Sequence, residues 1–426
     1  LAAGLGGLLL VEYQLFWPFL TTDARQPAYF RDLARQDDVR AVLNLPANHN
    51  LAAKFALYQQ TLHGKPLIAG HALRRTPQNP ALLALLEQVA GADAAGGVFT
   101  LTPETARYLL SAAGADRVIV HKPFMPDAAN ALDHVRAVLG APDYEDEQIA
   151  AFVVPRTGDP PPDLVLAGAG GSEGWSAPVD AGPFAGRFLA DDGAWHFYSA
   201  DVQYGELVFR ALPYRVARRV GFWLDDHLIA GTWIAGEAIR LPLWLEPGYH
   251  TLRLQALDGC TAYPFALTCW ESEELSADCA PGEPPACISA VFEAPEWVPA
   301  GHAPQPVEAA LDEGLRLRAV DLRLDADARA VDLRLFWAAE DSLPGSYALF
   351  VHVADPATDE PLAQIDAFPF VLTDAWGADS RWQSAVRVPL PDDLAAGTYA
   401  VNVGWFRPED GARLGLVRVG TITFEG

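Results

Sequence analysis

Basic residues are scarce in this chain of 426 residues, and no block of Lys and Arg occurs in it. Acidic residues outnumber basic ones 55 to 30, which gives a net charge of -25. A nucleic-acid-binding surface must neutralise successive phosphates with Lys and Arg, and anionic lipid headgroups attract the same cations. We therefore expect no nucleic-acid partner and no strong attraction to anionic lipid.

The chain also lacks an uninterrupted apolar run of the roughly 20 residues that a membrane-spanning helix needs. Its first residues, LAAGLGGLLLVEYQLFWPFL, are apolar through Val11 and then meet Glu12. They have neither the basic start nor the small-residue cleavage site of a signal peptide. We expect residues 1–25 to be the outer end of a transmembrane helix whose start lies upstream; a buried helix of a soluble protein is the alternative. The aromatic residues expected at headgroup level are Tyr13, Phe16 and Trp17.

Methionine is nearly absent. Met125 is the single one, and the sequence opens on Leu1. We therefore expect the sequence to be a piece of a longer precursor.

Cysteine is rare as well, and the few cysteines are clustered. Cys260, Cys269, Cys279 and Cys287 share one 28-residue window, with 8, 9 and 7 residues between neighbours and no histidine among them. Zinc sites typically use closer pairs, so we expect disulfides and no metal. Four cysteines allow three connectivities, of which we favour Cys260 with Cys287 and Cys269 with Cys279. Persistent disulfides imply an oxidising, extracytoplasmic compartment.

Half of the residues are hydrophobic, and at about 100 to 200 residues per domain the length predicts two to four folded domains. Residues 26–157 alternate short β-branched runs with helical patterns, which predicts a small α/β domain. The expected strands are 40–46, 66–73, 116–122 and 149–155, and the expected helices are 51–64, 79–91, 102–114 and 131–140. Asn79-Pro80 and Thr102-Pro103 mark helix starts, and Gly91 and Gly114 mark helix ends.

After a Pro- and Gly-rich linker the pattern changes to short alternating runs. Residues 163–297 and, after a second Pro-rich stretch, 306–426 alternate at period two between turn signals such as Glu246-Pro247-Gly248. This pattern predicts two antiparallel β-sandwiches of jelly-roll or immunoglobulin type, the first of which holds the disulfides. The expected fold class is thus multidomain α/β plus all-β.

Several motifs carry a resemblance that covers most of the chain. They include VEYQLFWPF, AVLNLP, YQQTLHGKPLIAGHALRR, RVIVHK, LEPGYHTLRLQALDGC and the stretch LRLFWAAEDSLPGSYALFVHVADPATDEPLAQIDAFP. With these the chain resembles the C-terminal, extracytoplasmic region of Chloroflexi-like polytopic membrane proteins that are similar to lipid-phosphate-sugar-dependent glycosyltransferases. In such enzymes the catalytic acid lies on an early loop that this sequence does not include, so the resemblance implies no catalytic residue here. Gln364 and Asp366 match a QxD pattern of the last domain, whereas DPATDEP departs from the shorter DxDG turn of that family.

One stretch, 58–75, gathers polar and basic residues around glycines. Because open α/β sheets bind ligands beyond the carboxyl ends of their strands, these residues are candidates for an anion or sugar site; packing or domain docking is the alternative. The candidates are Gln59, His63, Lys65, His71, Arg74 and Arg75, with His121 and Lys122 expected near the same edge. Lys65 also complements the dipole of the preceding helix, and a solvated strand end is the alternative for His121 and Lys122. The acidic run 143–148 is interpreted as a solvated turn.

The middle domain is rich in tryptophan, whose ring faces can stack on sugars. The candidates are Trp195, Trp223 and Trp233, in a region that also holds Trp175, Trp244, Asp225, Asp226 and Arg240. Burial in a sandwich core is the alternative for most of the tryptophans. No hydrolase triad, phosphate-binding glycine loop or HExxH motif stands out, so we expect no catalytic centre and no cofactor.

These observations predict an extracytoplasmic accessory region, tethered to the membrane by its N-terminal end, that recognises a glycan, a lipid-linked sugar or an envelope partner. A secreted carbohydrate-active enzyme with its site in the α/β domain is the first alternative. A structural or adhesive envelope protein is the second.

Overall fold

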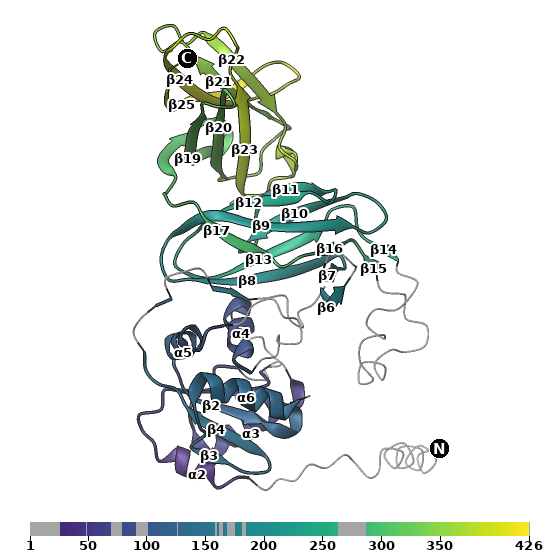
Figure 1. Ribbon diagram of the computed structural model, residues 1–426, viewed down its shortest axis with the longest axis vertical. Coiled ribbons are helices and arrows are strands. Elements are labelled where there is room, and N and C mark those ends of the chain that lie inside the picture. Colours follow the sequence, from purple (N-terminus) through teal and green to yellow (C-terminus); the bar gives the residue numbers. More distant parts are fainter. Residues whose placement is uncertain are drawn as a thin grey trace, which may run out of the picture.

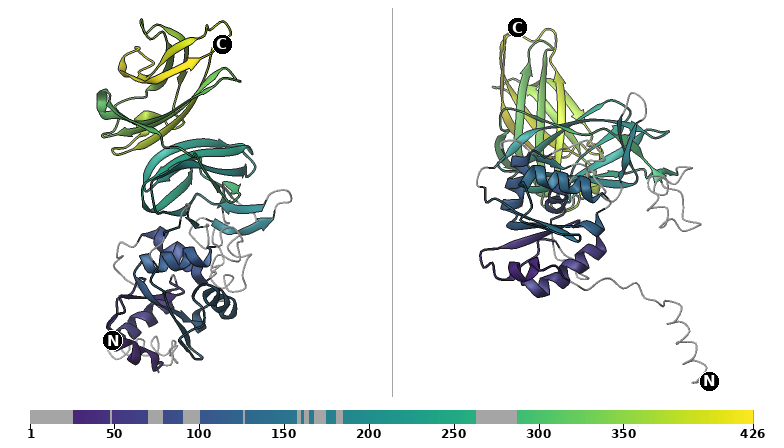
Figure 2. Two further views of the ribbon diagram at one scale, coloured as in Figure 1. Left: turned by 60° about the vertical axis from the view of Figure 1, so that its left-hand side comes forward. Right: turned by 60° about the horizontal axis from the view of Figure 1, so that its bottom comes forward.

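The computed structural model describes residues 26–47, 49–69, 79–90, 101–125, 127–157, 160–161, 165–167, 175–180, 185–262 and 287–425. Figures 1 and 2 show three units in tandem along the longest axis: an α/β unit, a middle β-sandwich and a last β-sandwich at the C-terminal end. The predicted fold class, α/β followed by two antiparallel sandwiches, is confirmed.

The α/β unit is built on one mixed sheet of four strands in the order β1-β2-β4-β3. The strands are β1 (Ala41–Leu45), β2 (Ala115–His121), β3 (Tyr144–Glu145) and β4 (Ile149–Val153). β1 and β2 are parallel, whereas β4 is antiparallel to both β2 and β3. The carboxyl ends of β1 and β2 therefore meet at one edge of the sheet.

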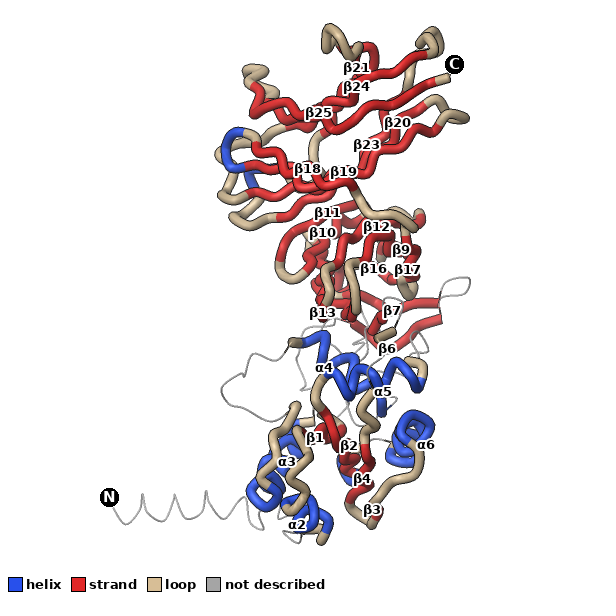
Figure 3. Tube along the Cα trace, turned by 90° about the vertical axis from the view of Figure 1, so that its left-hand side faces the viewer, coloured by secondary structure: helices blue, strands red, loops and turns tan. Residues whose placement is uncertain are grey.

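Helices cover both faces of this sheet (Figure 3). They are α2 (Tyr29–Ala34), α3 (Asn50–His63), α4 (Pro80–Glu87), α5 (Pro103–Ala112) and α6 (Ala128–Leu139), with 3-10 turns at Gln88–Ala90 and Lys122–Phe124. The side chains of Asn79 and Thr102 accept hydrogen bonds from the first turns of α4 and α5, as their sequence predicts. Gly64 ends α3 at a φ of 67°, a left-handed conformation that glycine adopts without strain. Gly91 lies outside the described residues.

One predicted strand of the unit is wrong as far as it is described. In 66–73, the structure shows a single parallel bridge between Leu67 and Val42, and residues 70–73 lie outside the described part. α2 and β3 were not expected. Both are short, so neither leaves a period long enough to read from sequence.

The middle sandwich packs a five-stranded sheet, β11-β10-β13-β8-β5, on a six-stranded one, β12-β9-β16-β7-β6 with β17 beside β9. The strands are β5 (Val165–Ala167), β6 (Trp175–Asp180), β7 (Ala185–Leu189), β8 (Asp192–Ser199), β9 (Gln203–Pro213), β10 (Arg218–Leu224), β11 (His227–Ile234), β12 (Ala238–Leu245), β13 (Gly248–Ala256), β16 (Ala290–Phe292) and β17 (Glu296–Pro299). A separate pair, β14 (Thr261–Ala262) and β15 (Cys287–Ile288), lies at its side. Inward-facing side chains such as Trp195, Phe209 and Phe292 form the core between the two sheets.

The last sandwich packs two four-stranded sheets, β18-β19-β20-β23 and β22-β21-β24-β25. The strands are β18 (Gln305–Ala310), β19 (Leu315–Asp325), β20 (Ala330–Ala339), β21 (Ala348–Ala354), β22 (Pro361–Ala367), β23 (Arg381–Pro389), β24 (Gly397–Phe406) and β25 (Arg413–Phe424), with 3-10 turns at Asp312–Gly314 and Thr373–Ala375. Trp337, Trp376 and Trp405 are each about 1% exposed or less in its core.

The α/β unit joins the middle sandwich through tyrosines. Tyr108 of α5 and Tyr198 of β8 place their hydroxyl groups 2.9 Å apart, and Tyr198 packs on Tyr249 of β13. Tyr198 belongs to the same hydrophobic cluster as the helices of the α/β unit. The two units thus share a continuous core.

The two sandwiches meet through a polar network. Asp321 of β19 accepts a hydrogen bond from the hydroxyl of Tyr204 of β9 (2.9 Å) and contacts His302 Nε2 at 3.0 Å. Arg334 of β20 contacts the Tyr204 hydroxyl at 3.4 Å and pairs with Glu206 of β9. Because Tyr204 and Glu206 belong to β9 of the middle sandwich and Asp321 and Arg334 to β19 and β20 of the last one, the network fixes how one sandwich sits on the other.

No helix within the described residues is long and apolar enough to cross a membrane. The expected transmembrane end, residues 1–25, lies outside that part of the chain.

Candidate functional site

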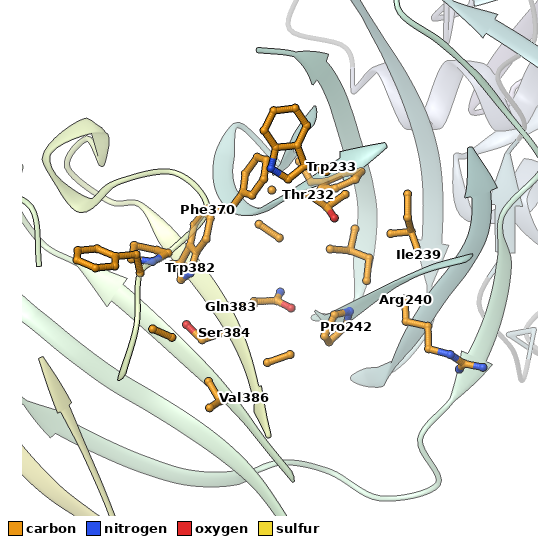
Figure 4. Close-up of a pocket in the computed structure, with 18 of the residues that line it drawn as sticks. Thr232, Trp233, Ile239, Arg240, Pro242, Phe370, Trp382, Gln383, Ser384 and Val386 are labelled. Atoms are coloured by element: carbon orange, nitrogen blue, oxygen red, sulfur yellow. The ribbon is translucent and has the colours of Figure 1, made fainter. Parts of the chain in front are cut away.

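A cleft of about 380 Å³ opens between the middle and last sandwiches (Figure 4). One wall consists of β11, β12 and the turn between them. The other wall consists of β23 and the segment 367–370 that follows β22. The cleft therefore exists because of the way the two sandwiches are docked.

Aromatic side chains line its mouth. Trp233 of β11 has an exposed fraction of 54%, and Phe370 meets its ring edge to face, with centroids 6.1 Å apart and an interplanar angle of 84°. Phe370 reaches this place because its neighbour across the boundary is Gly231, where an added Cβ would overlap the phenyl ring. Phe368, 60% exposed, extends the aromatic surface. These rings offer flat apolar area on which the face of a sugar could stack.

Polar groups lie deeper, beneath these rings. Gln383 and Ser384 of β23 and Thr232 of β11 line the cleft, and Figure 4 shows Gln383 and Ser384 between the two walls. The Oε1 atom of Gln383 is buried and has no hydrogen-bond partner among the described residues. A buried carbonyl oxygen without a donor costs free energy, so a ligand hydroxyl or a water at this point would be stabilising.

The charged residues at the rim are largely neutralised. Arg240 of β12 donates a hydrogen bond to Glu206 at 2.8 Å, and Figure 4 shows its guanidinium turned away from Gln383 and Ser384. Glu206 also pairs with Arg334. Glu237 lies nearby on the cleft wall. The site is thus aromatic and polar, with Glu237 as the single carboxylate among the described residues that line it.

A smaller hollow of about 40 Å³ adjoins the cleft. It shares Trp382 and Gln383 with it, and Trp244, Glu246 and Arg318 form its other side. Arg318 lies over the Trp244 ring at 5.2 Å. The face of Trp244 is therefore already covered by a cation.

Of the three tryptophans predicted to stack on sugar, only Trp233 is an open platform. Trp195 is 3% exposed and stacks on Trp175 at 5.7 Å within the core of the middle sandwich, so it follows the core alternative. Trp223 has Arg253 over its ring at 4.5 Å and packs against the core of the last sandwich. Trp195 thus faces the core of the middle sandwich, and one face of Trp223 is covered by Arg253.

Asp225 and Asp226 form the tight turn between β10 and β11, both with positive φ. Asp225 contacts His250 Nδ1 at 2.6 Å and accepts a hydrogen bond from the Thr251 backbone at 2.9 Å. Burial alone would lower the pKa of His250, but hydrogen bonds to Asp225 and to the Glu246 carbonyl raise it. These carboxylates stabilise a hairpin.

The structure separates the polar residues predicted to share one edge of the α/β sheet. Gln59, His63 and Lys65 lie beyond the amino ends of the strands, because α3 runs back along the sheet after β1. Lys65 donates a hydrogen bond to the Gln36 carbonyl there, ahead of β1. His121 and Lys122 lie at the carboxyl ends. The expectation of one shared edge is therefore wrong for these five, and His71, Arg74 and Arg75 lie outside the described residues.

At the amino edge, the side chains pack within the unit. His63 is 4% exposed, stacks on Phe30 at 5.8 Å and accepts a hydrogen bond from the Lys65 backbone at 3.0 Å. Burial, with the nearby Lys65 charge, lowers the pKa of His63 to about 4. Gln59 is 3% exposed. Both residues therefore pack within the unit, which was the alternative to a ligand-binding role.

At the carboxyl edge, His121 forms a buried pair with Asn44 of β1. The two side chains are 2% and 4% exposed, and His121 Nε2 lies 2.8 Å from Asn44 Oδ1. Burial lowers the pKa of His121 to about 4, so its ring is neutral at pH 7. The Asn44 amide nitrogen has no partner in the described part of the chain. Asn44 was not predicted, although a lone asparagine inside the apolar run AVLNLP was the available signal.

Lys122 faces the acidic run 143–148. Its Nζ donates hydrogen bonds to Glu145 at 2.8 Å and to the Asp146 carbonyl at 2.6 Å, and Arg136 of α6 pairs with Glu145 at 3.0 Å. Hydrogen bonds from Lys122 and Arg136 lower the pKa of Glu145. The run is thus more than a solvated turn, because it includes β3 and fastens α6 to the sheet.

The predicted disulfide between Cys260 and Cys287 is present. Asp191 lies near both sulfur atoms, but bonded sulfurs offer no thiolate to a metal. Cys269 and Cys279 lie outside the described residues, and their pairing stays a prediction.

Comparison with known proteins gives only slight similarities. No family model and no curated protein matches the chain. A GH26-CBM35 β-(1,4)-mannanase from Podospora anserina aligns at 13% identity and a TM-score of 0.21 over 39% of this chain and 32% of that one. A Bacteroides uniformis β-glucuronidase aligns at 10% identity and a TM-score of 0.20, over 55% of this chain and 26% of that one. A GH2 β-galacturonidase from Eisenbergiella tayi aligns at 10% identity and a TM-score of 0.17, over 62% of this chain and 43% of that one. The chain spans less than half the length of each, and at these scores the likeness assigns no function.

Proposed function

We propose that this chain is the saccharide-recognising, extracytoplasmic region of a membrane-attached protein similar to lipid-phosphate-sugar-dependent glycosyltransferases. Its binding site is the cleft between the two sandwiches. The single observation that carries the proposal is the combination of the exposed Trp233 ring with the unpartnered oxygen of Gln383 in one cleft of about 380 Å³.

The chemistry of the cleft supports a sugar as its ligand. A pyranose presents an apolar face of C–H groups and a rim of hydroxyls, and sites that bind such molecules combine apolar rings with a few fixed polar groups. Trp233 and Phe370 supply the rings, and Gln383 and Ser384 supply the polar groups. The sugar is expected to be neutral, because Arg240 is already paired with Glu206.

The location rests on other observations. The disulfide between Cys260 and Cys287 is consistent with an oxidising compartment. Membrane attachment through residues 1–25 and the relation to glycosyltransferases rest on the sequence and on the resemblance of its motifs.

Recognition rather than hydrolysis is favoured by the state of the carboxylates near the cleft. Glycosidases typically use two free carboxyl groups that flank the scissile bond. Among the described residues that line the cleft, Glu237 is the single carboxylate. Glu206, the partner of Arg240, is also held by Arg334, so it does not supply a second free carboxyl group.

The test is affinity electrophoresis through gels that contain galactomannan, xylan, mixed-linkage β-glucan or polygalacturonate. We expect the protein to be retarded by at least one neutral polymer and not by polygalacturonate. Trp233→Ala should weaken that binding at least about tenfold, which corresponds to about 1.4 kcal/mol. Tyr58→Ala, which removes an aromatic ring of similar exposure on α3, is the matched control and should bind as the wild type does. Absence of retardation by every polymer, or unchanged binding by Trp233→Ala, overturns the proposal.

A further inference from the structure

Helix α3 exposes most of its large apolar side chains. Its inner face consists of Ala52, Ala53, Ala56, Gln59 and His63, each at most 8% exposed. Its outer face carries Leu51, Leu57, Tyr58 and Leu62, with exposed fractions of 50%, 36%, 47% and 40%. A helix on the surface of a soluble domain normally turns its leucines inward. Here the small and polar residues are buried and the large apolar ones face outward.

The outer residues form one continuous strip. Positions 51, 54, 58 and 62 follow one another at helical spacing, with 57 and 61 beside them. The members other than the four apolar residues are Lys54 and Thr61, which are both exposed. We call this strip, residues 51, 54, 57, 58, 61 and 62, the outer strip of α3.

The charge of α3 also sets it apart. It contains no Asp or Glu, whereas each other α-helix in the described part contains one: Asp32 in α2, Glu87 in α4, Glu104 in α5 and Asp133 in α6. In a chain with a net charge of -25, an acid-free helix with one exposed lysine offers lipid phosphates a surface without a carboxylate of its own. Lys54 can extend its ammonium toward a phosphate while its methylenes stay on the apolar strip.

The position of α3 in the chain identifies the occupant. α2 lies against α3 through the stack of Phe30 on His63, and the described chain begins at Gln26, three residues before α2. The most apolar stretch of the sequence, residues 1–11, and the aromatic residues that follow it thus end close in sequence to the α2–α3 pair. A segment that enters a bilayer there would bring α3 to its surface.

We infer that the outer strip of α3 lies in the headgroup region of a zwitterionic bilayer and sets the orientation of the α/β unit on the membrane. The inference rests on the membrane attachment in the proposed function. Leucines buried at the headgroup boundary, a tyrosine at headgroup level and a lysine that reaches phosphate are the composition of interfacial helices. Glycan binding in the distant cleft is not required for it.

The experiment follows amide hydrogen exchange in the full chain, alone and reconstituted with phosphatidylcholine vesicles. We expect peptides from 50–63 to exchange at least about fivefold more slowly with vesicles than without, while peptides from 128–139 in α6 are unchanged. The variant Leu51→Ser/Leu57→Ser/Tyr58→Ser/Leu62→Ser should still float with the vesicles but lose this protection. Leu362→Ser/Leu416→Ser, which removes two leucines of similar exposure from the last sandwich, should keep it.

Each other outcome overturns the inference and says why. Flotation without slowed exchange in α3 refutes the orienting role but leaves the attachment intact. Failure of the wild type to float refutes the attachment as well. Exchange in α3 that is equally slow with and without vesicles refutes the contact with lipid, because the hydrogen bonds of the folded helix alone then account for the protection. If the variant with four substitutions unfolds, the inference is tested by the exchange of the wild type and of the variant Leu51→Ser/Leu62→Ser, which should also lose protection in α3.

Discussion

At the scale of single residues, buried histidines are the most consequential groups. His63, His121 and His196 are each at most 6% exposed, and burial lowers the pKa of each to about 4. His121 contacts Asn44, and His196 Nδ1 lies 3.1 Å from the Thr251 hydroxyl. A neutral imidazole fits these sites, whereas an imidazolium would need charge compensation that burial denies it.

Stability should therefore fall with acidity. Below about pH 6.5 the unfolded chain takes up a proton at each of these histidines, but the folded chain does so only near pH 4. The contribution is thus complete above about pH 6.5 and is lost as the pH falls toward 4. For His121 we expect a loss of about 2 kcal/mol of unfolding free energy between pH 7 and pH 5, measured by urea unfolding. His121→Gln should reduce the total loss by that amount, and the control His134→Gln should not. An unchanged loss in His121→Gln contradicts the argument.

Residues of the candidate site were only partly predictable. Trp233 could be proposed because a tryptophan in a sandwich either is buried in the core or offers an exposed ring for stacking. The exposed fraction in the structure then distinguishes these two cases. Phe370, Gln383 and Ser384 could not, since they belong to another sandwich and meet Trp233 only through the docking of the units. The predicted grouping of His63 with His121 was wrong for a related reason. The direction of α3 relative to the sheet decides at which edge His63 lies, and spacing along the chain does not show that direction.

At the scale of elements, the pair β14–β15 is the smallest in the fold. Two residues of each strand face one another, Thr261 with Ile288 and Ala262 with Cys287, and the disulfide lies directly beside them. Two-residue strands are not stable alone. The cross-link therefore maintains the pairing by closing a loop with a sequence separation of 27.

Removing this cross-link should destabilise the middle sandwich. A loop of this length predicts a loss of roughly 3.6 kcal/mol for Cys260→Ser/Cys287→Ser, mostly from the greater entropy of the unfolded chain. Denaturant unfolding followed by exchange of β10 and β13 peptides measures it. The exchange of α5 and α6 peptides serves as the internal reference and should change little. A loss below about 1 kcal/mol shows that the loop is already restrained by other contacts.

Elements with local signals were predicted well. α4 and α5 begin within one residue of the position set by Asn79-Pro80 and Thr102-Pro103, because caps act on the turn that follows them. The expected strand at 66–73 failed because an apolar β-branched run reports burial and not pairing. Leu67 forms a single bridge to Val42, next to the backbone hydrogen bonds from Val42 to Pro66 and from Ile68 to Val42.

At the scale of the whole molecule, the two sandwiches are docked through apolar contacts and through a buried polar pair. Tyr204 and Asp321 are 117 residues apart in sequence and both buried. Burial raises the pKa of Tyr204 to about 12. Burial alone would raise the pKa of Asp321, but hydrogen bonds from His302 and Tyr204 lower it. The sequence predicted the order of the three units but not this contact, since contacts between units leave no period in either partner.

A double-mutant cycle should reveal the coupling. Tyr204→Phe and Asp321→Asn together should cost less than the sum of the single changes, with an interaction energy of about 1–2 kcal/mol in urea unfolding. The exposed pair Arg316 and Glu340, 2.8 Å apart, is the control and should couple by less than about 1 kcal/mol. Additive effects at Tyr204 and Asp321 would mean that the apolar contacts around Phe336 hold the boundary without them.

The connection between the sandwiches is short and fixed at both ends. It runs from Pro299 to Gln305, with the Ala300 amide hydrogen-bonded to the Tyr204 carbonyl and His302 against Asp321. The last sandwich is therefore not joined to the middle one by a flexible tether. A long polymer gripped in the cleft and pulled sideways would transmit the pull through the whole stack of units (Figure 1). The membrane attachment proposed for residues 1–25 would then bear a torque with a lever arm as long as the molecule.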